Sequence, residues 1–182
     1  PDDKDTLHCR LPNAERRNPY ERAILSCAKI MANYDYDQLF PVYGFGAIIN
    51  DQEEKGTSYC FNINFQQDPN IKFVDNIIKE YYACLNKITF SGPTNFTPII
   101  KNIINEIKKE NKKFTYHVLM MLTDGKIDDF YDTVDALVEG SFLPLSVIII
   151  GIGDSEENLK DFKFMEILDA DDIPLISRNG IK

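Results

Sequence analysis

The apolar run Val-Leu-Met-Met-Leu at residues 118–122 restricts the fold of this chain more than any other feature. A strand that is apolar on both faces is typical of the middle of a sheet covered by helices on both sides. The run ends in Thr123, Asp124 and Gly125, and in open α/β sheets ligands bind at the carboxyl ends of such strands. Asp124 is therefore a candidate site residue. The alternative is that Asp124 and Gly125 only form a turn, with Asp128 capping the next helix.

Apolar periodicity predicts alternating helices and strands along the rest of the chain. Helices are expected over 19–33, 74–88, 98–113, 128–138 and 161–168, and strands over 39–50, 58–64, 117–123, 144–152 and 173–177. A short polar turn between 39–50 and 58–64 makes those two strands antiparallel, with 58–64 at the edge of the sheet. We expect 117–123 and 144–152 to be buried neighbours or next-but-one strands. The pattern predicts a single α/β domain with a mostly parallel sheet and helices on both faces.

Composition and motifs exclude several classes of function. The 182 residues include 29 acidic and 20 basic side chains, a net charge of −9, which argues against a nucleic-acid surface and against unaided docking on anionic membranes. Gly151 and Gly153 follow a strand, but Glu156 stands where a dinucleotide-binding loop needs its third glycine. Phosphate-loop and hydrolase-elbow motifs are absent from the sequence, so we expect no enzyme activity. The four cysteines have no CxxC spacing, which favours reduced thiols and a cytoplasmic protein.

Two loops remain as a candidate site, Gly-Pro-Thr-Asn-Phe at 92–96 and Thr-Asp-Gly at 123–125. Mg²⁺ binds a few hard oxygen ligands in octahedral geometry and keeps several waters. The hydroxyl of Thr94 and the carboxylate of Asp124 are suitable donors, and such a site leaves an open position for the carboxylate of a partner. The alternative is structural: Thr94 caps the helix that begins at Pro98, and Asp124 belongs to a turn. The residues alone leave both interpretations open.

Several segments of the chain closely resemble the von Willebrand factor A-type domain of copines. They are FPVYGFGA at 40–47, GPTNFTPII at 92–100, LTDGKIDD at 122–129 and LPLSVIIIGIG at 143–153, together with DDKDTLHC at 2–9 and NPYERAIL at 18–25. The resemblance covers nearly the whole chain and implies a three-layer, Rossmann-like von Willebrand factor A fold with one antiparallel edge strand. In the wider family of A domains, a metal-ion-dependent adhesion site uses a DxSxS-type loop, then a threonine, then an aspartate. Thr94 and Asp124 match the last two elements.

The resemblance also implies a function. Copines carry two calcium-dependent phospholipid-binding C2 domains before the A domain, which is regarded as a non-enzymatic protein-interaction module. The protein implied is cytoplasmic, associates with membranes when calcium is present, and recruits intracellular target proteins through its A domain. Mg²⁺, or alternatively Mn²⁺ or Ca²⁺, is expected at the adhesion site, where it binds an acidic residue of the target; the candidate partner-binding residues around it are Pro93, Asn95, Lys126 and Asp128.

A second function stays open, because copine-like A domains also occur joined to RING fingers. The chain is then the substrate-recruiting A domain of a copine-like RING-type ubiquitin ligase. No Cys/His spacing of the RING type lies within 1–182, so this alternative places the RING finger elsewhere in the protein.

The chain departs from the family pattern in two places. No buried hydrophobic strand with a DxSxS-like motif precedes Pro1, so the domain assigned to 1–182 is expected to lack its first strand and the first-loop ligands of the metal site. Asp128 stands where copines often have a threonine. It adds negative charge beside the expected site, or it caps a helix.

Overall fold

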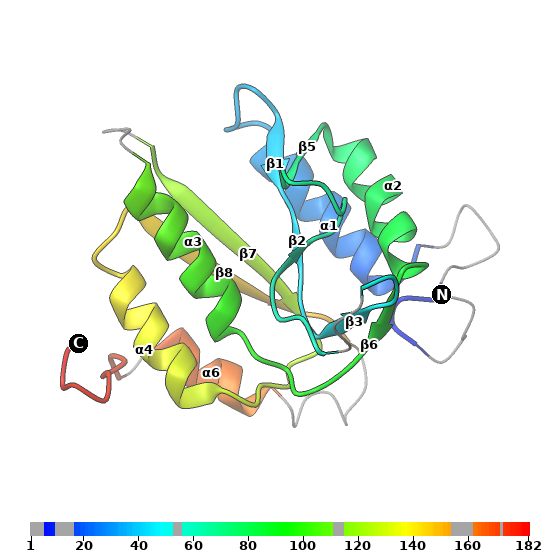
Figure 1. Cartoon of the computed structure of the whole chain (residues 1–182). Coiled ribbons are helices and arrows are strands. Elements are labelled where there is room, and N and C mark those ends of the chain that lie inside the picture. The colour runs from blue at the N-terminus through cyan, green and yellow to red at the C-terminus, as the bar shows by residue number, and fades with distance from the viewer. Residues whose placement is uncertain (1–5, 10–16, 53–55, 111–114, 154–161, 172) are drawn as a thin grey trace. The chain divides into compact units, whose positions relative to one another are not determined.

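The computed structural model describes residues 6–9, 17–52, 56–110, 115–153, 162–171 and 173–182 (Figure 1). The chain divides into two compact units, Pro1–Gly92 and Pro93–Lys182. Both units combine helices with strands, which confirms the α/β class. Within the described ranges, no helix is both long enough and apolar enough to cross a membrane.

The first unit contains two helices and several short strands. They are α1 (Pro19–Met31), β1 (Leu39–Pro41), β2 (Tyr43–Gly44), β3 (Ala47–Ile49), β4 (Phe61–Asn62), β5 (Asn70–Lys72), α2 (Val74–Leu85) and β6 (Ile88–Phe90). Helix α1 begins after Asn18, whose side-chain oxygen accepts a hydrogen bond from the Glu21 amide at 2.7 Å. Pro19 suits the first helical turn because it needs no hydrogen-bond acceptor there. The strand pairs β1–β5, β2–β4 and β3–β6 are all antiparallel.

The expected strand 39–50 is divided into β1, β2 and β3, and each of these pairs with a different strand. Pro41 at the end of β1 has no amide hydrogen to donate, and Gly46 before β3 has a φ of +69°, so the ladder breaks near both residues. The expected strand 58–64 is antiparallel, as predicted, but is shortened to β4 and one isolated bridge between Ser58 and β3.

The expected helix 74–88 ends at Leu85. The residues Ile-Thr-Phe at 88–90 instead form β6 and pair with β3, because β-branched and aromatic residues favour strands. Side chains from α2, β5 and the segment after β4 form the core of this unit. The buried members are Ile63, Ile71, Ile77 and Cys84, with partly buried Ile24, Ala28, Phe40, Val42, Phe61, Phe65 and Ile88 packed against them.

A cluster of aromatic and polar side chains holds residues 6–9 against both helices of the first unit. The ring of His8 stacks on Tyr20 of α1, with 3.9 Å between centroids, and on Phe90 of β6 at 4.5 Å. Its Nδ1 lies 2.8 Å from the hydroxyl oxygen of Tyr81 in α2. Asn18 also donates to that hydroxyl, at 3.4 Å, so His8 is part of a shared hydrogen-bond network.

The second unit contains α3 (Thr97–Lys109), β7 (His117–Thr123), α4 (Phe130–Gly140), β8 (Leu145–Gly151) and α6 (Lys163–Asp169). Strands β7 and β8 are parallel and pair along their whole length, from His117 with Leu145 to Thr123 with Gly151. Helix α4 lies between them in sequence, as parallel strands require a crossover connection. Of the two arrangements expected for these apolar runs, neighbouring or next-but-one strands, the structure has them as neighbours.

Burial of this strand pair is one-sided. Met121 and Thr123 are each 2% exposed, and α3 packs against β7. Val118 on the opposite face of β7 is 36% exposed, and Ile148 in β8 is 41% exposed. Alternate residues of a strand point to opposite faces, and the expectation of two fully buried strands is wrong for the face that carries Val118. An apolar run does not reveal which of its faces is covered.

The three-layer arrangement with a mostly parallel central sheet is not seen in the described part of the chain. There the strands form four two-stranded sheets, of which only β7–β8 is parallel. The expected strand 173–177 is wrong, because these residues are irregular and lead into a turn in which the Ser177 amide donates to the Ile181 carbonyl at 2.8 Å. The expected helix 161–168 corresponds to α6, although residue 161 lies outside the described residues.

Candidate functional site

The two loops singled out from the sequence meet in the second unit. The Thr94 amide donates to the Asp128 carboxylate at 2.6 Å, and the Asp128 amide donates to the Thr94 carbonyl at 2.8 Å. These reciprocal bonds join the segment before α3 to the segment between β7 and α4. Thr94 therefore lies beside the loop that Asp124 begins, at the carboxyl end of β7, where ligands bind in α/β sheets.

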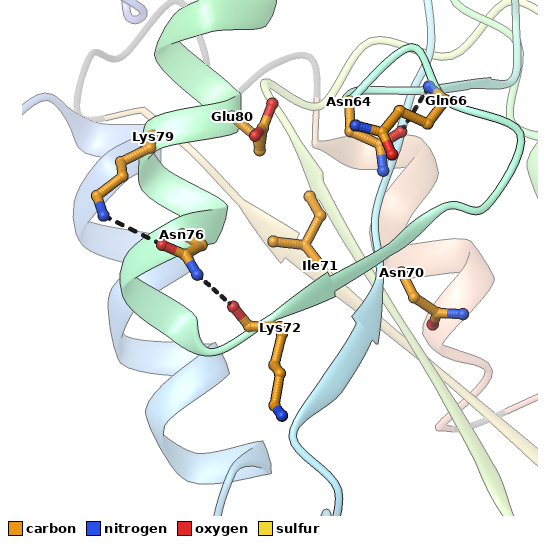
Figure 2. A pocket seen from close by; sticks show the side chains of 8 residues that line it. All are labelled: Asn64, Gln66, Asn70, Ile71, Lys72, Asn76, Lys79 and Glu80. Carbon is orange, nitrogen blue, oxygen red and sulfur yellow. Dashed lines mark hydrogen bonds between the residues drawn. The ribbon is translucent and has the colours of Figure 1, made fainter.

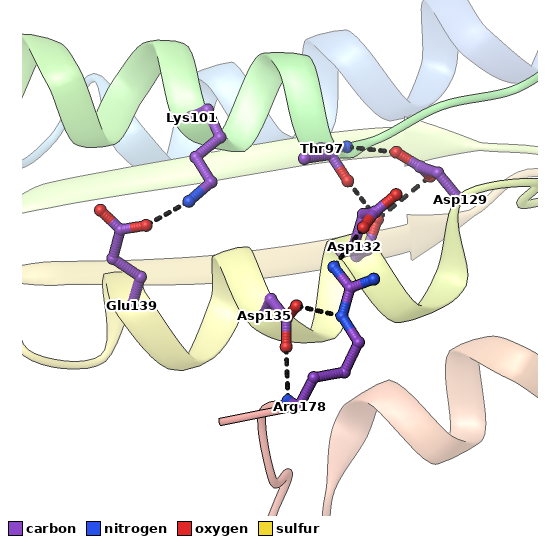
Figure 3. A network of polar contacts seen from close by, with 8 residues as sticks. Thr97, Lys101, Asp129, Asp132, Asp135, Glu139 and Arg178 are labelled. Atoms are coloured by element: carbon purple, nitrogen blue, oxygen red, sulfur yellow. Dashed lines mark hydrogen bonds and ion pairs between the residues drawn. The ribbon is translucent and has the colours of Figure 1, made fainter. Parts of the chain in front are cut away.

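Asp129 fixes this junction from the next position in the chain. Its carboxylate accepts hydrogen bonds from the amides of Phe96 at 2.9 Å and Thr97 at 2.8 Å, and from the Thr133 hydroxyl at 3.1 Å. The first amides of a helix have no partner within the helix, and α3 has no capping bond from its own N-cap side chain. Asp129, the residue before α4, supplies that cap, and its negative charge also suits the positive end of α3 (Figure 3).

Both local capping interpretations are wrong. Thr94 does not cap α3, which begins at Thr97 with Phe96 at the N-cap position. Asp128 does not cap α4, because its side chain accepts from the Thr94 amide and the N-cap residue of α4 is Asp129. Sequence reasoning missed Asp129. The only sequence signal for Asp129 was its place beside Asp128. Thr97, whose amide it binds, lies 32 residues away in the sequence.

The Thr123–Gly125 turn is tightly built. Thr123 is buried, its hydroxyl accepts from the Gly125 amide at 3.1 Å, and Gly125 has a φ of +101°. A Cβ atom on Gly125 would lie 2.8 Å from the Phe162 ring, and one on Gly151 would lie 2.6 Å from the same ring. Phe162 thus packs over the carboxyl ends of β7 and β8, and a side chain at either glycine would require its ring to move.

Asp124 and Thr94 offer the oxygen atoms expected for a metal site. Asp124 is exposed and Thr94 is half-buried, and neither side-chain oxygen is bonded to another described residue. A hydroxyl and a short carboxylate fit a hard cation such as Mg²⁺. In the described ranges, no group of three or more His, Cys, Asp or Glu residues is arranged to hold a metal ion, so the metal site at these two residues stays a prediction.

The candidate partner-binding residues lie on these same two loops. Pro93, Lys126 and Asp128 are exposed, and Asn95 is half-buried. The bonds between Asp128 and Thr94 give Asp128 a structural role that the sequence did not predict. Contact of these residues with a partner stays a prediction.

The other carboxylates along α4 are engaged in ion pairs (Figure 3). Arg178 donates to Asp135 through its backbone amide at 2.8 Å and through Nε at 2.6 Å, and it also pairs with Asp132. Glu139 pairs with Lys101 and, at 2.6 Å, with Lys108. These bonds lower the pKa of Asp135 and of Glu139 below their ordinary values. Among the described residues of this region, Asp124 is thus a carboxylate left open for a ligand.

Two comparisons with known proteins match nearly the whole chain. The family model described as Copine matches residues 6–181. Protein BONZAI 1 of Arabidopsis thaliana is 39% identical to the chain over 170 residues, which are 92% of this chain and 28% of that protein. The chain therefore spans just over a quarter of the length of this relative.

Proposed function

The chain belongs to the copine family, and from this we propose that it is a non-catalytic protein-interaction domain with a von Willebrand factor A-type fold. The protein that carries it binds phospholipid membranes when calcium is present, through C2 domains, and this domain brings target proteins to the membrane. The observation that carries the proposal is the junction between the segment that leads into α3 and the segment between β7 and α4, held by Asp128 and Asp129.

In this proposal the junction presents a metal-ion-dependent adhesion site. Thr94 and Asp124 supply oxygen ligands to Mg²⁺, and the remaining positions are taken by water, by further protein oxygens and by an acidic side chain of the target. The exposed residues Pro93, Lys126 and Asp128 form the rim that contacts the target. The fixed backbone of the junction supports this role, because a binding site needs its ligands held in place before the partner arrives.

A sedimentation experiment on the intact protein tests this function. Vesicles of phosphatidylserine and phosphatidylcholine should co-sediment the protein with calcium and release it with a chelator. The Asp124→Ala variant should still bind these vesicles, because the C2 domains are unchanged, but it should lose proteins that the wild type retains in the presence of Mg²⁺. Asp132→Ala removes an exposed carboxylate of α4 and serves as the matched control.

Two results would contradict the proposal. One is an intact protein that ignores calcium in the vesicle assay. The other is an Asp124→Ala variant that retains every Mg²⁺-dependent target. Ubiquitin transfer to a retained target would instead favour the ligase alternative, in which the same two loops recruit the substrate.

A further inference from the structure

A polar pocket of about 210 Å³ lies in the first unit, apart from the two loops described above. It is formed between α2, β5 and the loop that follows β4 (Figure 2). Its walls are mostly charged and amide side chains: Asn64, Gln66, Asn70, Ile71, Lys72, Asn76, Lys79 and Glu80. Two ammonium groups and one carboxylate give this lining a positive charge in a chain whose net charge is −9.

Among the described residues, neither Lys72 nor Lys79 forms an ion pair. Lys72 Nζ lies 5.1 Å from the centroid of the Phe73 ring, and Lys79 Nζ donates to Asn76 Oδ1 at 3.1 Å. An ammonium group has three N–H donors, so both lysines can bind a further acceptor.

Asn76 organises this side of the pocket. Its Nδ2 donates to the Lys72 carbonyl at 2.7 Å, while its Oδ1 accepts from Lys79. One side chain therefore ties α2 to the end of β5 and orients one of the lysines (Figure 2). Ile71, the residue before Lys72 in β5, is only 5% exposed and packs in the core of the first unit. This packing holds β5 in place. Donors held in place before binding lose less entropy when a ligand arrives.

The opposite wall is a loop held by its own side chains. Asn64 Nδ2 donates to the Asp68 carbonyl at 2.8 Å, and Asn64 Oδ1 accepts from the Gln66 amide at 3.0 Å. The side-chain amide of Gln66 and the carboxylate of Glu80 form no hydrogen bond with another described residue. The pocket thus offers ammonium and amide donors for an anion, and amide and carboxylate acceptors for N–H groups.

The volume restricts what can bind. At about 30 Å³ for each water, the pocket holds roughly seven waters. It is smaller than the roughly 300–1,000 Å³ of pockets that enclose a drug-sized ligand or cofactor. One side chain with its peptide group fits within it.

We propose that this pocket binds an acidic segment of a partner protein. A Glu or Asp carboxylate of that segment lies between Lys72 and Lys79, and its peptide N–H groups donate to Glu80 and to the Gln66 side chain. A peptide matches both kinds of group in the pocket. A membrane surface matches less well, because Glu80 and the net charge of the chain repel a dense array of phosphates. This site uses no metal ion and does not depend on Asp124.

The test uses the intact protein and a short, end-blocked, fluorescent peptide of alternating glutamate and alanine. Fluorescence polarisation should show binding of this peptide and no binding of its glutamine counterpart. Lys72→Gln and Lys79→Gln should each weaken binding about fivefold, since one partly exposed ion pair contributes up to about 1 kcal/mol. Lys29→Gln, which removes an exposed lysine of α1, should leave binding within twofold.

Several outcomes would overturn the proposal. They are failure of the glutamate peptide to bind, equal binding of both peptides, and an effect of Lys29→Gln as large as that of the pocket substitutions. Loss of phosphatidylserine vesicle binding in the Lys72→Gln variant, with peptide binding unchanged, would assign the pocket to a membrane instead. Peptide binding that survives Asp124→Ala separates this site from the proposed adhesion site, since the two depend on different residues.

Discussion

Asp129→Ala should release the amino terminus of α3. The substitution removes the acceptor for the Phe96 and Thr97 amides and for the Thr133 hydroxyl. Loss of a helix cap costs about 1–2 kcal/mol, and a buried amide left without an acceptor costs about 1–3 kcal/mol. Phe96 is fully buried, so little water can replace the carboxylate. The two costs overlap, and we expect a total of about 2–4 kcal/mol.

Hydrogen exchange measures this loss locally in the intact protein. Opening that is easier by about 2–4 kcal/mol should speed exchange of the amides at the start of α3 by roughly 30-fold to 1,000-fold. Asp129→Asn keeps one acceptor oxygen and should lie between the wild type and Asp129→Ala. Asp132→Ala removes only an exposed ion pair with Arg178 and should change exchange by less than about fivefold. Exchange at these amides that is no faster in Asp129→Ala than in Asp132→Ala would show that Asp129 does not cap α3.

Other changes probe separate parts of the molecule. Burial lowers the pKa of His8 from its ordinary value of 6.5 to about 4. As the pH falls, the His8 ring therefore takes up a proton in the unfolded chain before it does so in the folded protein. The stability that depends on neutral His8 is complete above pH 6.5 and is lost as the pH falls to 4, by about 3 kcal/mol in total; His8→Phe should flatten that part of an unfolding-versus-pH series. Gly125→Ala should destabilise the protein by about 1–3 kcal/mol in thermal unfolding, because of its positive φ and the nearby Phe162 ring, whereas Gly92→Ala meets no atom and should not. Asp128→Ala should weaken Mg²⁺ binding measured by calorimetry without unfolding the protein, because Thr94 loses a 2.6 Å bond.

The parts of the fold that sequence predicts well are those with local signals. The apolar runs at 117–123 and 144–152 led to the parallel pair β7–β8, and the apolar stripes of α1 and α3 placed those helices to within one residue at their starts. The pairing of β6 with β3 joins residues about 40 positions apart. No local pattern reports such a partner, so the sequence assigns Ile88 to the preceding helix and predicts no strand at 88–90.

The candidate site shows the same division between what local patterns predict and what depends on residues far apart in the sequence. The convergence of the Thr94 and Asp124 loops could be expected, because the loops of an α/β sheet that bind ligands meet at the carboxyl ends of its strands. The hydrogen bonds that bring the two loops together could not be expected from the sequence. Capping rules examine the few residues before a helix, whereas α3 is capped by Asp129 from another element. Asp128 and Asp129 are adjacent and chemically identical, and only the folded backbone gives each a different partner.

Calorimetric titration of the intact protein with Mg²⁺ tests the central claim, that Thr94 and Asp124 together hold a metal ion. Removing a carboxylate ligand should lower Mg²⁺ affinity at least about tenfold, so Asp124→Ala should show that loss while Asp132→Ala binds Mg²⁺ as the wild type does. Both variants should keep the wild-type circular dichroism spectrum, because the side chain of Asp124 makes no bond to another described residue. A folded Asp124→Ala protein with unchanged Mg²⁺ affinity would contradict the account.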